Sequence, residues 1–150
     1  MIVPAHPATG GPPAGATVSR VPIRVRFAET DLMAIVHHGS YLLYAEEARV
    51  EYLRRRGARY ADWIARDEHF PVVDLRVRYR AAATFGDELV VETWIGAHTR
   101  VSLRFDYRIL RGNAVLAEAY TTLACIDGRH VPRPISRAVL EQVLGPETCP

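Results

Sequence analysis

The stretch from residue 27 to residue 40 gathers the side chains best suited to chemistry, two acids and two histidines, around an apolar insert. Asp31 stands seven residues before His38, which leaves a loop long enough to fold back on itself. In such a loop a carboxylate can face the first backbone N–H groups of a following helix, which have no partner within that helix. Those N–H groups polarise a carbonyl oxygen, while the carboxylate supplies a base or a nucleophile to its carbon. The spacing therefore predicts an acyl-transfer site.

The same residues also have plainer interpretations. Asp31 could be a turn carboxylate that caps nearby backbone N–H groups, and His38 a packed residue at the start of a helix. A metal site made with His37, His38 and His69 is disfavoured, because adjacent histidines in an extended segment cannot readily turn to one ion. The sequence also lacks the i,i+4 histidine pair or paired cysteines of common metal motifs. We expect no metal and no cofactor.

A strand and a helix must hold this loop in place. Before it, Ile23, Val25 and Phe27 alternate with arginines, which is the period-2 pattern of a half-buried strand. After it, Ser40 is a plausible N-cap for a helix that ends in three arginines followed by Gly57. The apolar stripe of this helix consists of Tyr41, Tyr44, Ala45, Ala48 and Tyr52, widened by Leu42, Leu43 and Leu53. We expect the helix to be largely buried.

The rest of the chain has the pattern of short helices and strands. Helices are predicted at residues 60–66 and 136–144, strands at 73–79, 89–95, 101–109 and 115–127, and a hairpin turn at 111–113. Strands joined by short turns form antiparallel sheets, so we predict an α+β fold with one central helix packed against the sheet. Residues 1–19, with four prolines, three glycines and no Asp, Glu or Arg, are predicted to be a flexible tail, and residues 20–150 a single domain.

Composition narrows the chemistry further. All 19 basic residues of the 150-residue chain are arginines, and without lysine the sequence excludes Schiff-base and P-loop lysine chemistry. Against 17 acidic residues they leave a net charge of +2, which is too even to predict a nucleic-acid partner. The sequence has no run of about 18 apolar residues that would predict a membrane span. Two cysteines are too few for a disulfide framework, so we expect a cytoplasmic protein in which Cys125 is buried packing.

Two sequence blocks carry a resemblance to a known family. The first, FAETDLMAIVHHGSYLLYAEEARVEYLR, resembles the opening motif of the hotdog-fold acyl-CoA thioesterases of the 4-hydroxybenzoyl-CoA thioesterase type, in particular the branch associated with the bacterial Tol-Pal cluster. Its matching positions are Phe27, Thr30, Asp31, Ala34, Ile35, Val36, His38 and Tyr41. The second block, residues 77–89, resembles the segment RY..PA.FGD.L of that family. The resemblance extends from Val21 to Pro134. It departs at Leu32-Met33, where small residues are usual, and at Ala82 or Ala83, where the family has proline.

The resemblance implies a five-stranded antiparallel sheet wrapped around the helix. It also implies a homodimer or homotetramer with active sites at the subunit interface, and hydrolysis of an acyl-CoA thioester without metal. By the same resemblance Asp31 is the catalytic carboxylate, which either attacks the thioester or activates water, and the backbone N–H of His38 is the oxyanion donor. Gly39, Ser40 and Tyr41, which open the helix, are assigned to substrate binding.

Further residues and activities follow as expectations. CoA phosphates call for cationic donors near a solvent-facing edge, and the candidates are Arg100, Ser102, Arg129 and Arg133. Glu47 and Glu51 lie on the helix, where some members of the family place a catalytic glutamate; with a loop acid present, we interpret both as exposed or paired with arginines. Two alternatives to acyl-CoA hydrolysis stay open, a non-catalytic acyl-CoA-binding hotdog protein and a thioesterase that acts on acyl-carrier-protein thioesters.

Overall fold

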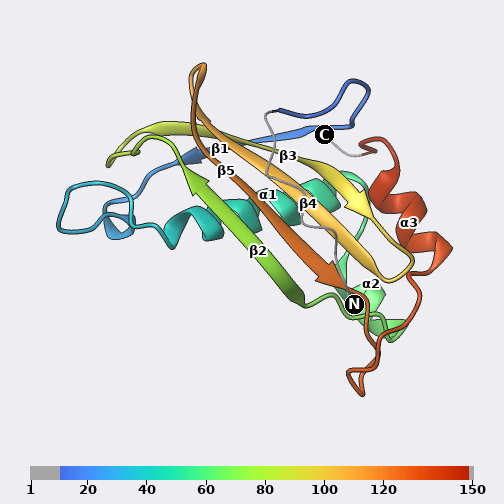
Figure 1. The fold of residues 1–150 in the computed structure, drawn as a ribbon. Helices are drawn as coiled ribbons and strands as arrows, with labels where there is room; N and C mark the ends of the chain where they lie inside the picture. The colour runs from blue at the N-terminus through green and yellow to red at the C-terminus, as the bar shows by residue number, and fades with distance from the viewer. Residues whose placement is uncertain (1–10, 149–150) are drawn as a thin grey trace.

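Five antiparallel strands curve around one long helix (Figure 1). The computed structural model describes residues 11–148. The strands are β1 (Ser19–Arg24), β2 (Val72–Tyr79), β3 (Glu88–His98), β4 (Ser102–Arg111) and β5 (Ala114–Ala124). The helices are the 3-10 turn η1 (Phe27–Glu29), α1 (Ser40–Arg55), α2 (Tyr60–Ala65) and α3 (Arg137–Leu144). This architecture confirms the predicted α+β fold.

The strands lie in the order β1-β3-β4-β5-β2, and each neighbouring pair is antiparallel. Short turns join β3 to β4 and β4 to β5, and Gly112 has the positive φ, +58°, that the tight second turn requires. β1 and β2 form the two edges of the sheet. The segment between them, which carries the loop 30–38 and α1, therefore has to cross from one edge to the other.

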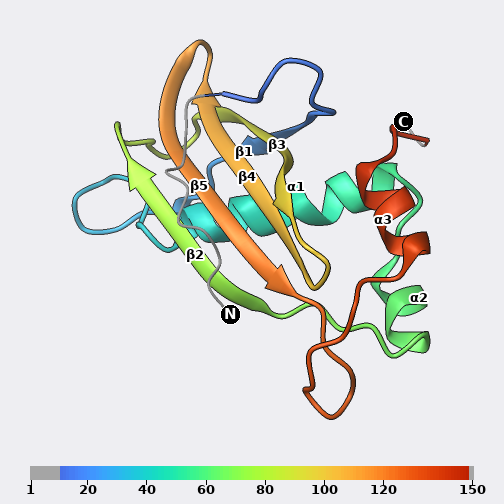
Figure 2. The ribbon, with the colours of Figure 1, turned by 45° about the vertical axis from the view of Figure 1, so that its right-hand side comes forward.

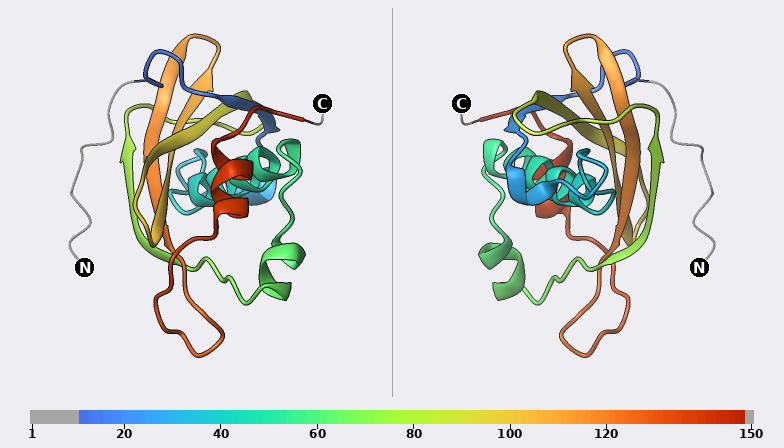
Figure 3. Two further views of the ribbon diagram at one scale, coloured as in Figure 1. Left: turned by 90° about the vertical axis from the view of Figure 1, so that its right-hand side faces the viewer. Right: turned by 90° about the vertical axis from the view of Figure 1, so that its left-hand side faces the viewer.

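α1 lies in the concave face of the sheet, and Figure 3 shows the sheet curving around the helix, which is seen nearly end-on. The predicted stripe is buried, since Tyr41, Tyr44, Ala45, Ala48 and Tyr52 are each 3% exposed or less. Leu53 is buried as well, but Leu43 is 57% exposed and its assignment to the stripe is wrong. It follows Leu42 by one helical step of about 100°, which turns it away from the sheet.

Two predicted boundaries of the strands are wrong. Phe27 is not a strand residue but begins η1, where it is 75% exposed and packs edge-on against Phe85 at a ring-centroid distance of 5.7 Å. β5 ends at Ala124 rather than at Asp127, because the chain there turns to make isolated bridges from Ile126 to two loop segments. Local alternation alone does not show where a sheet partner ends.

The predicted tail begins outside the described residues, which exclude 1–10. Its last residue, Ser19, is instead the first residue of β1 and is fully buried. The Ser19 hydroxyl accepts a hydrogen bond from Arg56 at 2.8 Å and donates one to Glu147 at 2.5 Å. In the part of the chain that the structure describes, no helix is both long enough and apolar enough to cross a membrane.

Candidate active site

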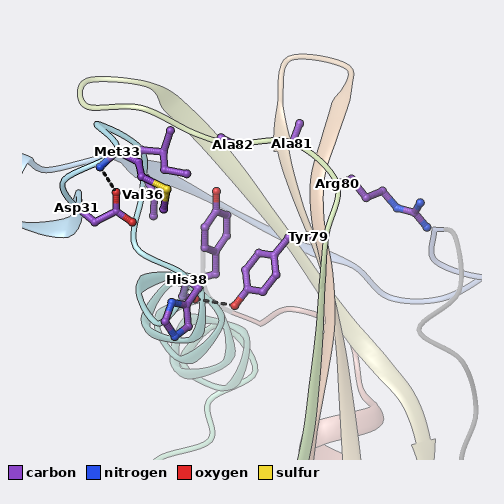
Figure 4. Close-up of a pocket in the computed structure, with 10 residues that line it drawn as sticks. Asp31, Met33, Val36, His38, Tyr79, Arg80, Ala81 and Ala82 are labelled. Carbon is purple, nitrogen blue, oxygen red and sulfur yellow. Dashed lines mark hydrogen bonds between the residues drawn. The ribbon is translucent and has the colours of Figure 1, made fainter.

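The two sequence blocks meet at a cavity of about 300 Å³ beside the N-terminal end of α1 (Figure 4). Its walls come from the loop before α1, the first turn of α1, the end of β2 and residues 80–82. Backbone hydrogen bonds join the blocks: the Val36 N–H donates to the Ala83 carbonyl at 2.8 Å, and the Ala83 N–H donates to the Tyr41 hydroxyl at 3.1 Å. Ala83 is fully buried at this junction. The fold therefore brings together the residues that the sequence places in two separate motifs.

The loop that carries Asp31 is closed on itself as a small ribbon. Thr30 and Val36 form an antiparallel bridge, and the Asp31 N–H donates to the Ile35 carbonyl at 2.9 Å. A turn at the tip is completed by the Ala34 N–H, which donates to the Asp31 carbonyl at 2.9 Å. These bonds hold the backbone of Asp31 at the cavity wall.

The Asp31 carboxylate lines the cavity and is partly exposed. One carboxylate oxygen, Oδ1, accepts the Met33 N–H at 2.8 Å, as Figure 4 shows. Among the described residues, no donor is bonded to the other oxygen, Oδ2, which is free to act on a ligand. The carboxylate is thus oriented by one hydrogen bond and still has an available lone pair, which suits a base or a nucleophile.

His38 stands at the other side of the same cavity, two residues before the first residue of α1. Its carbonyl accepts a hydrogen bond from the Tyr79 hydroxyl at 2.7 Å (Figure 4). Its N–H has no acceptor among the described residues. The imidazole is exposed and lies against the ring of His37, with ring centroids 4.1 Å apart. An unpaired N–H at a helix start can receive the oxygen of a polarised carbonyl.

The loop after β2 is fixed from outside the cavity by Asp87 and Arg111. The Asp87 carboxylate accepts the Thr84 N–H at 2.9 Å and the Arg111 guanidinium at 2.6 Å. These two hydrogen bonds, the Thr84 one foremost, lower the pKa of Asp87. Arg111 also donates to the Ala82 carbonyl at 3.2 Å, so the wall at residues 80–82 is tied to the end of β4.

Of the three residues assigned to substrate binding at the helix start, only Tyr41 lines the cavity. The Gly39 N–H is already donated to the imidazole Nδ1 of His37 at 3.0 Å. Ser40 is 8% exposed, and its hydroxyl donates to the carbonyl of Glu29 at 3.3 Å. It is a helical residue and not the N-cap, which is Gly39. Within this chain the Gly39 N–H and the Ser40 hydroxyl therefore already have internal partners, and the assignment of both residues to substrate binding stays a prediction.

The residues expected to hold CoA phosphates are not brought to the cavity. Ser102 pairs with Ala124 of β5, whereas the cavity residue Tyr79 pairs with Ala117. Seven residues of strand separate these positions, roughly 23 Å. Arg100 lies in the β3–β4 turn, two residues before Ser102 begins β4, and this turn lies at the opposite end of the sheet from the loop 30–38 (Figure 1).

Most of the side chains expected to hold CoA phosphates also have partners within the chain. Ser102 is 3% exposed, and its hydroxyl is 2.7 Å from that of Thr99. The Arg133 guanidinium donates to the carbonyls of Arg66 and Asp67 at 3.3 and 2.9 Å, near α2. Arg129 forms an ion pair with Asp127 at 3.6 Å. Within one chain, therefore, Ser102, Arg129 and Arg133 each have an internal partner, and the loop that follows β5 lies at the opposite end of the sheet from the loop 30–38 (Figure 2).

The remaining candidates behave as packing or surface groups. Glu51 pairs with Arg54 and Arg55, and the hydrogen bond from Arg54 leads the effects that lower its pKa to about 2. Glu47 is exposed. Cys125 is a fully buried free thiol, and burial raises its pKa to about 11, which confirms the prediction of packing and makes a nucleophilic thiolate unfavourable. Within residues 11–148, no group of three His, Cys, Asp or Glu side chains is arranged to hold a metal.

Two residues at the site were not identified from the sequence. Tyr79 was assigned only to the pattern of a strand, yet it lines the cavity and holds the His38 carbonyl. Glu29 was noted only as an acid near Asp31, yet it is 7% exposed and accepts hydrogen bonds from Arg26 and Tyr44. The available signal was the position of Glu29 as a charged residue between Phe27 and the pair Thr30-Asp31. The sequence alone does not show its hydrogen-bond partners, because they lie on two different elements.

Comparison with known proteins identifies the family of this chain. The chain matches the model of the thioesterase-like superfamily over residues 25–143. It is 33% identical over 111 residues to the putative acyl-CoA thioesterase YneP of Bacillus subtilis, which covers 73% of this chain and 80% of that protein. It is 32% identical over 128 residues to the acyl-CoA thioester hydrolase YbgC of Escherichia coli, which covers 84% of this chain and 96% of that protein.

Solved structures of other proteins have the same fold as this chain. A hypothetical protein from Thermus thermophilus superimposes with a TM-score of 0.77 at 38% identity, over 86% of this chain and 99% of that one. A 4-hydroxybenzoyl CoA thioesterase has a TM-score of 0.78 at 17% identity, over 85% of this chain and 99% of that one, and shows the likeness of fold. The chain is a member of the thioesterase-like superfamily with the hotdog fold. The family and the class of enzyme predicted from the two blocks, a thioester hydrolase, are thereby confirmed.

Proposed function

We propose that this chain hydrolyses acyl-CoA thioesters, with Asp31 as the catalytic carboxylate and the backbone N–H of His38 as the oxyanion donor. The observation that carries the proposal is that Asp31, with its oriented carboxylate, and His38, whose N–H has no acceptor among the described residues, line one cavity of about 300 Å³. The relatives YneP and YbgC, which are named as acting on acyl-CoA thioesters, support this substrate class.

The chemistry follows from those two groups. The thioester carbonyl oxygen would accept the His38 N–H, which stabilises the negative charge that develops on it. Asp31 then acts in one of two ways. As a nucleophile it forms an anhydride with the acyl group and releases the CoA thiolate, and water cleaves the anhydride. As a base it takes a proton from water, the hydroxide attacks the carbon, and the leaving thiolate recovers the proton.

The acyl group would occupy the apolar part of the cavity. Met33, Val36 and the ring of Tyr41 form its walls, and the small residues Ala81 and Ala82 leave room opposite them. Met33 stands where the family resemblance leads one to expect a small residue. A larger side chain at this wall leaves less room for the acyl group, which favours a compact acyl group over a bulky one.

We also propose that the active unit is at least a homodimer paired through β2. This strand forms one edge of the sheet, and its side chains Val73 and Leu75 are 51% and 48% exposed. Exposed apolar edge strands pair readily with another chain. Since the Tyr79 end of β2 lines the cavity, a partner at this edge would stand beside the site. In such a dimer Arg100 of the partner subunit remains a candidate for the CoA phosphates. Sedimentation of the purified chain as a monomer would contradict this arrangement.

The test is the replacement Asp31→Asn, assayed by release of free thiol from short-chain, long-chain and aromatic acyl-CoA substrates. The variant keeps the shape of the side chain and its bond to the Met33 N–H, so its melting temperature should match that of the parent. Its kcat should fall by about 100- to 10,000-fold. Full activity of the variant would refute the role of Asp31.

The same assay separates the alternatives. Binding of acyl-CoA without turnover of any substrate by the parent chain would favour a non-catalytic hotdog protein. Faster hydrolysis of an acyl-carrier-protein thioester than of the CoA thioester with the same acyl group would favour a carrier-protein thioesterase. We place the enzyme in the cytoplasm, a location supported by its unpaired, buried Cys125.

A further inference from the structure

Glu29 is the most heavily hydrogen-bonded carboxylate near the cavity, although it does not line the cavity itself. Its Oε2 accepts the Tyr44 hydroxyl at 2.7 Å and the Arg26 backbone N–H at 2.9 Å. Its Oε1 accepts the Arg26 guanidinium, with the Nε at 2.8 Å and the Nη2 at 2.7 Å. Four donors therefore satisfy a side chain that is only 7% exposed.

The backbone of the same residue closes the loop that holds Asp31. The Glu29 carbonyl accepts the His37 N–H at 2.8 Å and, at 3.3 Å, the hydroxyl of Ser40. Glu29 thus holds the last rung of the ribbon between residues 30 and 36, immediately before His38. Both its side chain and its carbonyl therefore bind residues of α1, and the carbonyl also binds the residue before His38.

The partners of Glu29 lie on two different elements. Arg26 precedes η1, whereas Tyr44 lies in the second turn of α1 and is 2% exposed. Asp31 follows η1 by two residues, whereas His38 precedes the first residue of α1 by two. The bond from the Tyr44 hydroxyl to the Glu29 carboxylate, together with the bond from the Ser40 hydroxyl to the Glu29 carbonyl, joins these two parts of the chain.

We propose that Glu29 is a positioning residue, which sets the distance between the Asp31 carboxylate and the His38 N–H by docking η1 onto α1. This inference rests on the proposed roles of Asp31 and His38. An error of about 1 Å in such a pair can cost on the order of 100-fold in rate. The carboxylate is favoured over a neutral amide, because three of its four donors come from Arg26 and two of these belong to the cationic guanidinium.

The charge state of Glu29 agrees with this arrangement. Burial by itself would raise the pKa of the carboxyl group, but the hydrogen bonds from Arg26 and Tyr44 outweigh it, and the pKa is lowered. The other charged groups that border this side of Glu29 are Arg24 of β1 and Glu47 of α1. The residue is therefore ionised when the enzyme is at neutral pH.

The experiment compares Glu29→Gln with a matched control, Glu68→Gln. Glu68 is also buried, at 1% exposure, and accepts the Ser136 N–H at 3.0 Å and the Arg66 guanidinium at 3.3 Å. It lies after α2, at the other end of the molecule from the cavity. Both variants remove a buried charge and should lower the melting temperature.

Only Glu29→Gln should lower the kcat for thiol release from an acyl-CoA, by about 10- to 100-fold. Its KM should stay within about two-fold of the parent value, because Glu29 does not touch the cavity. Tyr44→Phe removes one of the four donors and should show a smaller fall of the same kind. It also serves as the second variant if Glu29→Gln does not fold.

Hydrogen exchange of the segment 30–38 gives a readout that does not depend on activity. Its amides should exchange faster in Glu29→Gln than in Glu68→Gln, because the His37 N–H loses a firmly held acceptor. An unchanged exchange rate, or a kcat no lower than that of the control, would overturn the inference. If Asp31→Asn keeps full activity, the proposed role of Asp31 fails, whereas the exchange rates still decide whether Glu29 holds the segment 30–38.

Discussion

Ala34 at the tip of the Asp31 loop has a left-handed backbone, with φ of +60°. Alanine is strained there because its Cβ approaches the following carbonyl oxygen, whereas glycine has no such contact. Ala34 is exposed, and it does not line the cavity. The replacement Ala34→Gly therefore changes the backbone strain of the loop and little else.

The size of the effect follows from two opposing contributions. Removing the left-handed strain stabilises the folded state by about 1–2 kcal/mol. The greater freedom of glycine in the unfolded chain costs about 0.5–1 kcal/mol. The difference is about 0–1.5 kcal/mol, and its midpoint of about 0.75 kcal/mol raises the melting temperature of a chain of this size by about 1.5–3 °C.

The assay is calorimetry or circular dichroism on the parent, on Ala34→Gly and on a control, His130→Gly. His130 has nearly the same φ, +64°, in an exposed turn where its N–H donates to the Asp127 carbonyl. The melting temperature should rise by a similar amount in both variants, and the kcat of each should stay within about two-fold of the parent value. Ala34→Val should instead lose stability, since a branched side chain is strained further at positive φ.

Two results would refute this reasoning. If His130→Gly raises the melting temperature and Ala34→Gly does not, the strain at Ala34 is not what limits the stability of the loop. If Ala34→Gly is more stable but has a kcat reduced more than about ten-fold, the stiffness of alanine contributes to catalysis. In that case, the conformation of the loop would depend on residue 34 as well as on its hydrogen bonds.

Two other perturbations test single contacts. Tyr79→Phe keeps the ring at the cavity but removes the 2.7 Å hydrogen bond to the His38 carbonyl. Loss of this bond, at about 1 kcal/mol, predicts that kcat/KM in the thiol-release assay falls about five-fold. An unchanged kcat/KM would show that this bond does not hold the oxyanion donor. The pKa of Glu51 is about 2, lowered first by the hydrogen bond from Arg54 and then by Arg55, against an ordinary value of 4.5. Because the folded-state pKa is depressed, the stabilisation is present above pH 4.5 and is lost as the pH falls toward 2. Glu51→Gln should flatten the melting temperature against pH across this window, and 1 M salt should shrink the difference between variant and parent, since these pairs are partly exposed.

Local pattern in the sequence determined most of the fold. Period-2 alternation located β2 and β4, turn signals located β3 and β5, and the helical spacing of Tyr41, Tyr44 and Tyr52 gave α1 and its buried face, because these patterns reflect the geometry of one element. The spacing of Asp31 and His38 pointed to a carboxylate facing a helix start for the same reason. The boundaries at Phe27 and at the end of β5 failed, since they depend on partners elsewhere in the chain.

The site itself was decided by tertiary structure. That Asp31 and His38 line one cavity depends on residues 79–83, which lie more than forty positions further along the chain. The partners that occupy Ser40 and Ser102, and the distance of Arg100 from the cavity within one chain, follow from the order and register of the strands. Glu29 gained a role only when η1 was seen against α1. A sequence shows which groups are present, but hydrogen bonds between distant segments decide which of them remain free to act.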